Sequence, residues 1–328
     1  GQHLNHGEIV HIQHEYAFFG YLLPWQNHFR SMTRQIDKPI VITKHVSFDG
    51  PLNIPGQSPA HLIRQIKWAM YNRWLGPYAS YLNKGTFEIA QQIIVLSARL
   101  KDQLIRRGLK SDRIHVIPAG VPQFPTVSGG DQLRADWSWH TKKIIGLFGY
   151  ITPAKGHLIA LDSLAQLPED YVLLIAGGLR RGADRSALDA IERKIDQLRI
   201  RPRVRITGYL EETDIAKHIQ ACQVLIYPYT HVDSSYSVVT GLAYQSVPII
   251  ASDVYAHREL ANQGAGLALF RSGEPIELAK SIEAIVNDRD RQAQMLAADK
   301  RYANDHSWTA IAQQTREVYR QAIVTTGL

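Results

Sequence analysis

The stretch from Ile144 to Gly156, IIGLFGYITPAKG, limits the possible fold of this chain more than any other segment. Ile144–Phe148 is apolar without alternation, which is the pattern of a strand buried on both faces of a parallel sheet. Gly149 and Pro153 then break the pattern and predict a turn. The segment therefore predicts an α/β fold in which a turn follows the carboxyl end of a buried strand.

A helix and a second strand follow this turn. Leucines recur at helical spacing over Leu158–Leu167, and Tyr171–Ala176 is an apolar strand closed by Gly177–Gly178. Strand, turn, helix and strand form a βαβ unit, whose turn is a common site for anions. Lys155 is the fixed positive charge of the turn. Two interpretations stand: Lys155 and the backbone N–H groups hold a diphosphate, or Lys155 is a solvated turn lysine.

Composition excludes several classes of protein. With 328 residues the chain is long enough for two domains with full cores. The single cysteine, Cys222, excludes an intramolecular disulfide, and its apolar surroundings predict a buried thiol, which suits the cytoplasm. The net charge of +7 permits an anionic ligand, an anionic lipid surface or nucleic acid and does not choose among them. Zinc-finger spacing and interleaved RNA-binding aromatics are absent from the sequence, so we expect no nucleic-acid partner.

Apolar runs and helical periodicities predict two domains. The predicted strands are 9–14, 39–44, 89–96, 114–118, 144–148, 171–176, 203–207, 224–227, 248–251 and 267–270. The predicted helices are 21–36, 99–107, 158–167, 214–221, 276–286 and the segments from about 290 onward. Proline, glycine and serine are dense over 118–131, which places the boundary there. We expect domains at 1–125 and 126–305, with a last helix, 306–328, returning toward the first domain.

No metal site is expected. His11 and His14 lie in one predicted strand, three residues apart, so their side chains point to opposite faces. Asp288 and Asp290 form a DxD motif, but the charged turn NDRDRQ around them is typical of a solvated helix end. His45 follows the carboxyl end of a predicted strand, where it faces a ligand or serves as a capped loop histidine.

Residues 50–87 have no acidic side chain but carry four basic ones, at 64, 67, 73 and 84. Tryptophan and tyrosine recur there at helical spacing, which is compatible with an interfacial helix on an anionic membrane. The alternative is an aromatic core stripe with a solvated basic face. Pro77 interrupts the amphipathic face and favours the core alternative. A peripheral membrane contact, at the inner face of a membrane, remains the second interpretation.

The ordered segments resemble one protein family. They are VHIQHE (10–15), VITKH (41–45), QIIVLS (92–97), RIHVIPAGVP (113–122), GLFGYITPAKG (146–156), YVLLIAGG (171–178), VRITGYLEETDIAKHIQACQVLIYPY (204–229), SVPIIASD (246–253) and GAGLAL (264–269). Together they are similar to the retaining nucleotide-sugar glycosyltransferases of family four, on the GT-B fold, over about 9–324. The resemblance implies two Rossmann-like domains facing each other across a cleft. It also implies a UDP- or GDP-sugar donor held mainly by the second domain, with no separate cofactor.

The resemblance also implies roles for residues of the second domain. The glycine and the lysine that contact the donor diphosphate in the family match Gly149 and Lys155. Tyr150 stands where the family often has an arginine, so part of the phosphate clamp is absent or supplied elsewhere. The nucleotide base is expected near the glycine turn Gly208, Tyr209 and Leu210.

Further matches concern the donor sugar and the acceptor. The first acid of the family's glutamate pair matches Asp233, which would hydrogen-bond sugar hydroxyls, and the second matches Gly241, which has no side chain to bind ribose. The small-residue loop that reaches the phosphate matches Ser234, Ser235, Tyr236 and Ser237. His45 is expected against the reacting sugar, and His14 and Glu15 are expected to line the acceptor side.

The implied reaction moves a sugar from a nucleotide diphosphate to a glycan or lipid-linked acceptor with retention of configuration. Lys155 and a helix N-terminus would stabilise the leaving diphosphate. A degenerate subunit that binds nucleotide or glycan without catalysis is the alternative, and an epimerase or phosphorylase on the same fold is a third reading. The family usually has further βα units before VHIQHE, so a fragment, a second chain that completes the domain, or a shortened homologue is expected. The base, sugar, acceptor and linkage do not follow from the sequence.

Overall fold

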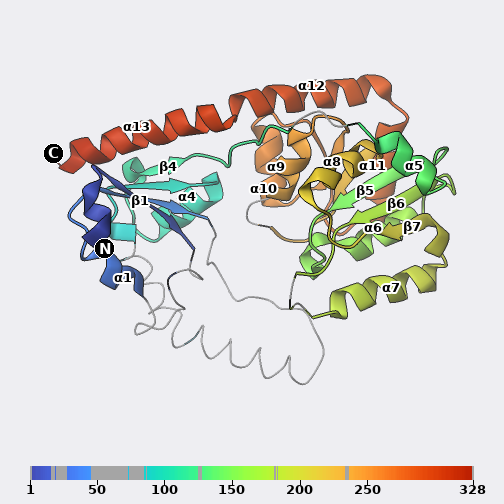
Figure 1. The fold of residues 1–328 in the computed structure, drawn as a ribbon, viewed down its shortest axis with the longest axis horizontal. Helices are drawn as coiled ribbons and strands as arrows, with labels where there is room; N and C mark the ends of the chain where they lie inside the picture. Colours follow the sequence, from blue (N-terminus) through green and yellow to red (C-terminus); the bar gives the residue numbers. More distant parts are fainter. Residues whose placement is uncertain are drawn as a thin grey trace. The chain divides into compact units, whose positions relative to one another are not determined.

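The computed structural model describes residues 2–15, 19, 28–45, 73, 85, 87–124, 128–180, 182, 184–232 and 236–326. Contacts between residues divide the chain into two units (Figure 1). Unit 1 comprises Gly1–Pro118 and Thr309–Leu328, and unit 2 comprises Ala119–Trp308. The chain first passes from unit 1 to unit 2 after Pro118, at the start of the proline- and glycine-rich stretch 118–131. The sequence predicted the end of the first domain at residue 125.

Unit 1 contains a parallel sheet. Its described elements are η1 (Gln2–His6), β1 (Val10–His14), α1 (His28–Thr33), β2 (Ile40–Lys44), β3 (Gln92–Val95), α4 (Ala98–Arg106), η4 (Ser111–Arg113), β4 (Ile114–Val116) and α13 (Trp308–Thr326). The described strands pair in the order β1-β2-β3-β4, and every pairing is parallel. Parallel strands covered on both faces read as continuous apolar runs, which is why IVITK and QIIV were recognisable in the sequence.

Helices cover both faces of this sheet. Ile42 and Ile93 belong to the same buried cluster as Leu100 and Leu104 of α4. On the other face, alternate strand residues such as Val41 and Ile94 pack in a cluster with Ile311, Val318 and Ala322 of α13. The last helix thus completes the core of unit 1 although unit 2 separates it from the rest of that unit in the sequence.

Unit 2 contains the second parallel sheet, in the order β10-β9-β8-β5-β6-β7 among the described strands. Its elements are α5 (Gly130–Asp136), β5 (Lys143–Phe148), η5 (Pro153–Lys155), α6 (His157–Leu164), β6 (Tyr171–Ala176), α7 (Ser186–Leu198), η6 (Arg201–Arg203), β7 (Val204–Ile206), α8 (Glu212–Gln220), β8 (Val224–Tyr227), α9 (Tyr236–Ala243), β9 (Ile249–Ser252), α10 (Tyr255–Asn262), β10 (Leu267–Phe270), α11 (Pro275–Val286) and α12 (Arg289–Asp305). The order reverses between β5 and β8, which is the topological switch point of a doubly wound sheet. The predicted α/β class is confirmed.

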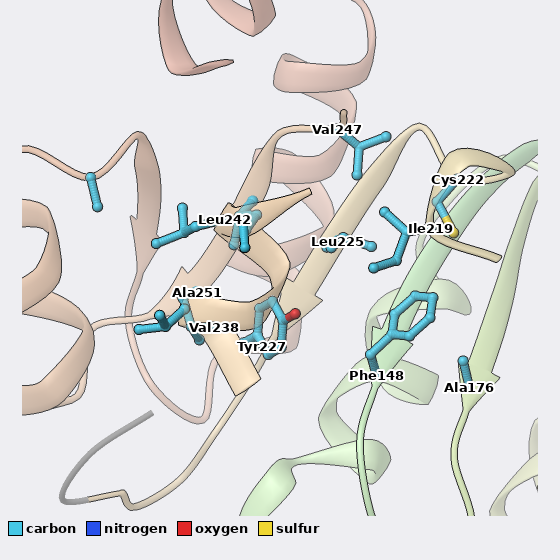
Figure 2. Packing of buried hydrophobic residues seen from close by; sticks show 14 of the residues in the cluster. Phe148, Ala176, Ile219, Cys222, Leu225, Tyr227, Val238, Leu242, Val247 and Ala251 are labelled. Carbon is cyan, nitrogen blue, oxygen red and sulfur yellow. The ribbon is translucent and has the colours of Figure 1, made fainter. Parts of the chain in front are cut away.

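The core of unit 2 lies on both sides of its sheet. Phe148 of β5 belongs to one cluster and its neighbour Leu147 to the other, because successive strand residues point to opposite faces. Figure 2 shows part of the first cluster, which includes Val238 and Leu242 of α9 and Tyr227 of β8. Cys222 is a buried member of this cluster, as predicted, and burial raises the pKa of its thiol well above the usual range.

Each predicted strand has a counterpart in the structure, with ends that differ by at most a few residues. Helices α5, α7, α9 and α10 were not predicted. Of the predicted helix 21–36, residues 21–27 lie outside the described part, and α1 occupies His28–Thr33. Most of 50–87, the stretch weighed for a membrane contact, also lies outside it. Among the helices that the structure describes, none is both long enough and apolar enough to span a bilayer.

Candidate functional site

Lys155 lies at the switch point of unit 2. It ends η5, directly after the turn that leaves β5. Its Nζ donates hydrogen bonds to the Tyr229 hydroxyl at 2.7 Å and to the Ser237 hydroxyl at 2.9 Å. Tyr229 follows β8 and Ser237 lies in the first turn of α9. Lys155 therefore joins the carboxyl ends of β5 and β8, the place where ligands bind in doubly wound sheets.

Glycines make this close arrangement possible. Gly149 has a φ of 114°, and a Cβ added there would lie 2.7 Å from the Lys155 Nζ. A Cβ at Gly156 would collide with the Pro228 carbonyl oxygen, and one at Gly177 with the Gly149 carbonyl oxygen. The backbones after β5, β6 and β8 thus approach one another more closely than any side chain would allow.

The charged ammonium group of Lys155 is partly buried and therefore poorly solvated. Burial, together with the nearby Arg180 guanidinium, lowers the pKa of Lys155 to about 8. Within the described part of the chain, no carboxylate forms an ion pair with Lys155, and its hydrogen-bond acceptors are hydroxyl oxygens. A half-buried ammonium group without a counter-ion is suited to binding an anion.

A partly exposed tyrosine, Tyr150, lies on the turn beside this lysine. Gly149 N–H donates to the Ala176 carbonyl and Ile151 N–H to the Gly178 carbonyl, so the turn after β5 runs alongside the end of β6. The ring of Tyr150, which is partly exposed, lies 5.1 Å from the Arg180 guanidinium carbon. These contacts place Tyr150 and Arg180 beside each other at the carboxyl ends of β5 and β6, next to the turn that contains Lys155.

The predicted base turn lies at the neighbouring strand end. Gly208 has a φ of 75°, and the Tyr209 side chain after it is 66% exposed. A Cβ at Gly178 would lie 3.0 Å from the Tyr209 nitrogen, so this turn adjoins the end of β6. The Leu210 side chain is partly buried against the core.

The predicted loop 234–237 and Asp233 before it are only partly described, and the described residues of the loop, Tyr236 and Ser237, belong to helix α9. Asp233, Ser234 and Ser235 lie outside the described residues. The side chain of Tyr236 is exposed, and the Ser237 hydroxyl accepts a hydrogen bond from Lys155 Nζ. Gly241 lies buried in α9, where an added Cβ would be 2.5 Å from the Tyr227 hydroxyl. A side chain at position 241 would therefore displace the Tyr227 hydroxyl.

His45 lies at the carboxyl end of β2 in unit 1, as predicted. Its Nε2 is 2.6 Å from the Gln13 side-chain oxygen, and the Gln13 amide nitrogen is 3.3 Å from His11 Nε2. His11 in turn bonds the Tyr319 hydroxyl of α13 at 2.6 Å. A polar chain therefore runs from α13 to His45 along one face of the sheet.

His14 ends β1, inside the predicted strand 9–14, but its side chain does not line an open face as expected for the acceptor side. It is 3% exposed among the rings of Phe19, Phe29 and Phe87. Burial lowers its pKa to about 4. Its side chain belongs to the core because it points to the face opposite His11 and Gln13. Glu15 follows it, and its role on the acceptor side stays a prediction.

Sequence reasoning missed several site residues. Tyr229 lay in the apolar run QVLIYPY, which is typical of a strand and gives no sign of a polar contact. Arg180 was recognisable only as a basic residue after a glycine pair that closes a strand. Gln13 lies between histidines that attracted the attention of the sequence analysis. The contacts that identify these three residues join segments that are far apart in the sequence.

The DxD motif has a structural role. The Asp288 carboxylate accepts a hydrogen bond from the Arg291 backbone N–H at 2.9 Å and caps the N-terminus of α12. The interpretation of this motif as a helix end is therefore confirmed. Among the residues that the structure describes, no three histidine, cysteine or acidic side chains gather into a group able to hold a metal ion.

Comparison with known families identifies the class of protein. Residues 131–302 match the family model of glycosyl transferases group 1, and residues 4–123 match that of glycosyltransferase family 4. The first match covers more than half of the chain. The chain belongs to the glycosyl transferases group 1 family.

Two characterised relatives show how distant the similarity is. The D-inositol 3-phosphate glycosyltransferase of Xylanimonas cellulosilytica is 26% identical over 243 residues, which cover 71% of this chain and 58% of the relative. The alpha-D-kanosaminyltransferase of Streptomyces kanamyceticus is 22% identical over 316 residues, or 93% of this chain and 74% of the relative. The chain thus spans little more than half the length of the first of these relatives.

Solved structures share the fold. HepE of Anabaena, crystallised with UDP, superposes with a TM-score of 0.72 at 20% identity, over 97% of this chain and 80% of HepE. The sucrose-phosphate synthase of Thermosynechococcus elongatus gives 0.71 at 20% identity, over 97% and 74% of the two chains. Both are GT-B proteins, so the predicted architecture of two Rossmann-like domains is confirmed.

Proposed function

We propose that this protein transfers a sugar from a nucleoside diphosphate donor to a glycan or lipid-linked acceptor, with retention of the anomeric configuration. The observation that carries the proposal is Lys155, a half-buried cation at the switch point whose described hydrogen-bond acceptors are all hydroxyl oxygens. The diphosphate of a nucleotide sugar gains negative charge as the bond to the anomeric carbon breaks. A preorganised cation at that place stabilises the charge in the transition state.

Other groups have defined parts in this proposal. Gly149 lets the diphosphate approach the backbone, and the turn at Gly208, Tyr209 and Leu210 lies beside the base. Asp233 accepts hydrogen bonds from the sugar hydroxyls. Ser234 and Ser235, with Tyr236 and Ser237 at the start of α9, contact the phosphate. His45 of unit 1 contacts the reacting sugar, and Glu15 faces the acceptor. No metal ion and no cofactor beyond the donor take part.

The relatives suggest which donors and acceptors to examine first. HepE was crystallised with UDP-glucose, and a Mycobacterium tuberculosis relative, 25% identical over 229 residues, is a GDP-mannose-dependent mannosyltransferase. UDP-glucose and GDP-mannose are therefore the first donors to try. A mannosyltransferase of Mycobacterium leprae, 25% identical over 223 residues, acts on phosphatidyl-myo-inositol, which makes a lipid-linked acceptor reasonable. A reaction at the inner face of a membrane belongs to the same proposal.

Nucleotide binding and turnover test the proposal together. A nucleotide at about 100 times its dissociation constant should stabilise the folded chain by roughly 2.7 kcal/mol, seen as a raised melting temperature. Lys155→Ala removes a charge-assisted hydrogen bond and should weaken UDP or GDP binding by about 10- to 100-fold. The matched control is Lys280→Ala, because Lys280 is exposed on α11.

The outcomes separate the alternatives. Donor turnover in the wild type that Lys155→Ala abolishes and Lys280→Ala leaves intact supports a transferase, and NMR of the product reports retention. Binding without turnover, across a panel of glycan and lipid acceptors, would point to the degenerate binding subunit instead. If neither UDP nor GDP raises the melting temperature, the proposed donor site is wrong.

A further inference from the structure

We propose that Arg180, held by the ring of Tyr150, is the second cation of the donor site and binds the diphosphate together with Lys155. This inference rests on the proposed function, and it names a residue outside every segment that the sequence had associated with the donor. Tyr150 directly follows Gly149 in the turn after β5. The structure places a guanidinium over the ring of that tyrosine.

The first argument is the course of the backbone. The Gly149–Ile151 turn is tied to the end of β6 by two hydrogen bonds, from Gly149 N–H to Ala176 at 3.1 Å and from Ile151 N–H to Gly178 at 2.9 Å. Arg180 follows Gly178 by two residues and therefore emerges beside Tyr150. The carboxyl ends of β5 and β6 thus direct Lys155 and Arg180 to the same edge of the sheet.

The second argument is orientation. The Arg180 guanidinium carbon lies 5.1 Å from the centre of the Tyr150 ring, within the range of a cation–π contact. Arg180 is an exposed residue, so without such a contact its long side chain would sample many rotamers. A ring under the guanidinium reduces this freedom while leaving the N–H groups available. Arginine can then donate two parallel hydrogen bonds to phosphate oxygens.

The third argument is charge. Among the residues that the structure describes, neither Arg180 nor Lys155 forms an ion pair with a carboxylate. Arg180 lies near enough to Lys155 to contribute to its lowered pKa. Two cations that repel each other without a counter-ion are stabilised by a ligand with more than one negative charge. A nucleoside diphosphate carries more negative charge than a monophosphate and can offer a separate phosphate to each cation, whereas a nucleoside offers none.

The test compares ligands that differ only in phosphate. Affinities of UDP, UMP and uridine, or of the guanosine series if the wild type prefers it, are measured by calorimetry and by ligand-observed NMR. Arg180→Ala should weaken UDP binding at least tenfold, weaken UMP less, and leave uridine unchanged. Tyr150→Ala should produce a smaller loss of the same pattern, because the cation remains but loses its support. Arg180→Lys should restore part of the loss, because a lysine keeps the charge without the planar fork.

The control is Arg185→Ala, which removes the same charge from an exposed arginine paired with Asp189 on α7. Equal weakening of UDP by Arg185→Ala would reduce the effect to net charge and overturn the inference. Equal weakening of UDP and uridine by Arg180→Ala would show a contact to the nucleoside or a fold defect, and would also overturn it. If Arg180→Ala binds UDP as tightly as the wild type while Lys155→Ala binds it more weakly, the role of Arg180 is refuted and the proposed function stands. Failure of the wild type to bind any nucleotide would refute both.

Discussion

Lys155 is a partly buried cation whose described hydrogen-bond partners carry no negative charge. Its ammonium group is half-buried and close to Arg180, and both conditions oppose its charge. Its partners Tyr229 and Ser237 are neutral hydroxyl groups. The surrounding histidines add no charge near neutral pH, because burial lowers the pKa of His157 and of His257 to about 4. The site therefore carries a positive charge, on Lys155, that a bound anion would neutralise.

This arrangement predicts how nucleotide affinity depends on pH. The free protein loses the Lys155 proton as pH rises through about 8, whereas a bound diphosphate favours the protonated form and raises that pKa. Binding therefore takes up a proton above pH 8, and UDP affinity should fall about tenfold between pH 7 and pH 9. Lys155→Arg should give a nearly flat profile, whatever its absolute affinity, because arginine stays charged. Calorimetric titrations across this range check the slope, and a flat wild-type profile would contradict the assignment.

At the scale of elements, the strands were predictable and several helices were not. Each strand is buried on both faces, so its sequence is apolar throughout, and Tyr171–Ala176 and Val224–Tyr227 match the predicted ranges. Helix α9, YSVVTGLA, combines β-branched residues with a glycine, which individually disfavour a helix; packing of Val238, Leu242 and Gly241 on the core overrides that preference. Lys155 was singled out by its place in the predicted turn and Gly149 by the resemblance, as candidates for the proposed donor site, whereas Arg180 and Tyr229 required contacts that a sequence does not display.

Helix α13 offers a matched pair of valines for testing its contribution to unit 1. Val318 is 3% exposed and packs in the cluster with Val41 and Ile94, whereas Val324 is 78% exposed. Val318→Ala should lower the free energy of unfolding by about 2 kcal/mol, the transfer of the lost methyl groups plus a small cavity. Val324→Ala should change it by less than about 0.5 kcal/mol. Urea unfolding of both variants decides: equal effects would mean that α13 does not pack on this sheet.

At the scale of the whole molecule, the chain passes from unit 1 to unit 2 and returns. Unit 1 needs both ends of the sequence, because residues of α13 complete the cluster that contains Ile117. Unit 2 is continuous from Ala119 to Trp308, and both of its core clusters lie inside that range. The proposed donor residues Gly149, Lys155 and Arg180 all belong to unit 2, whereas His45 belongs to unit 1.

This division predicts what unit 2 does alone. A fragment of residues 119–308 keeps its whole sheet and both of its core clusters, so it should fold cooperatively and give a single unfolding transition. It should bind UDP, or GDP if the full chain prefers it, within about threefold of the full chain's affinity, and Lys155→Ala and Arg180→Ala should weaken that binding as they do in the full chain. It should not transfer sugar, because His45 and Glu15 are absent. A folded fragment that binds no nucleotide would show that unit 1 supplies essential donor contacts. A fragment that transfers sugar would remove His45 from the proposed reaction.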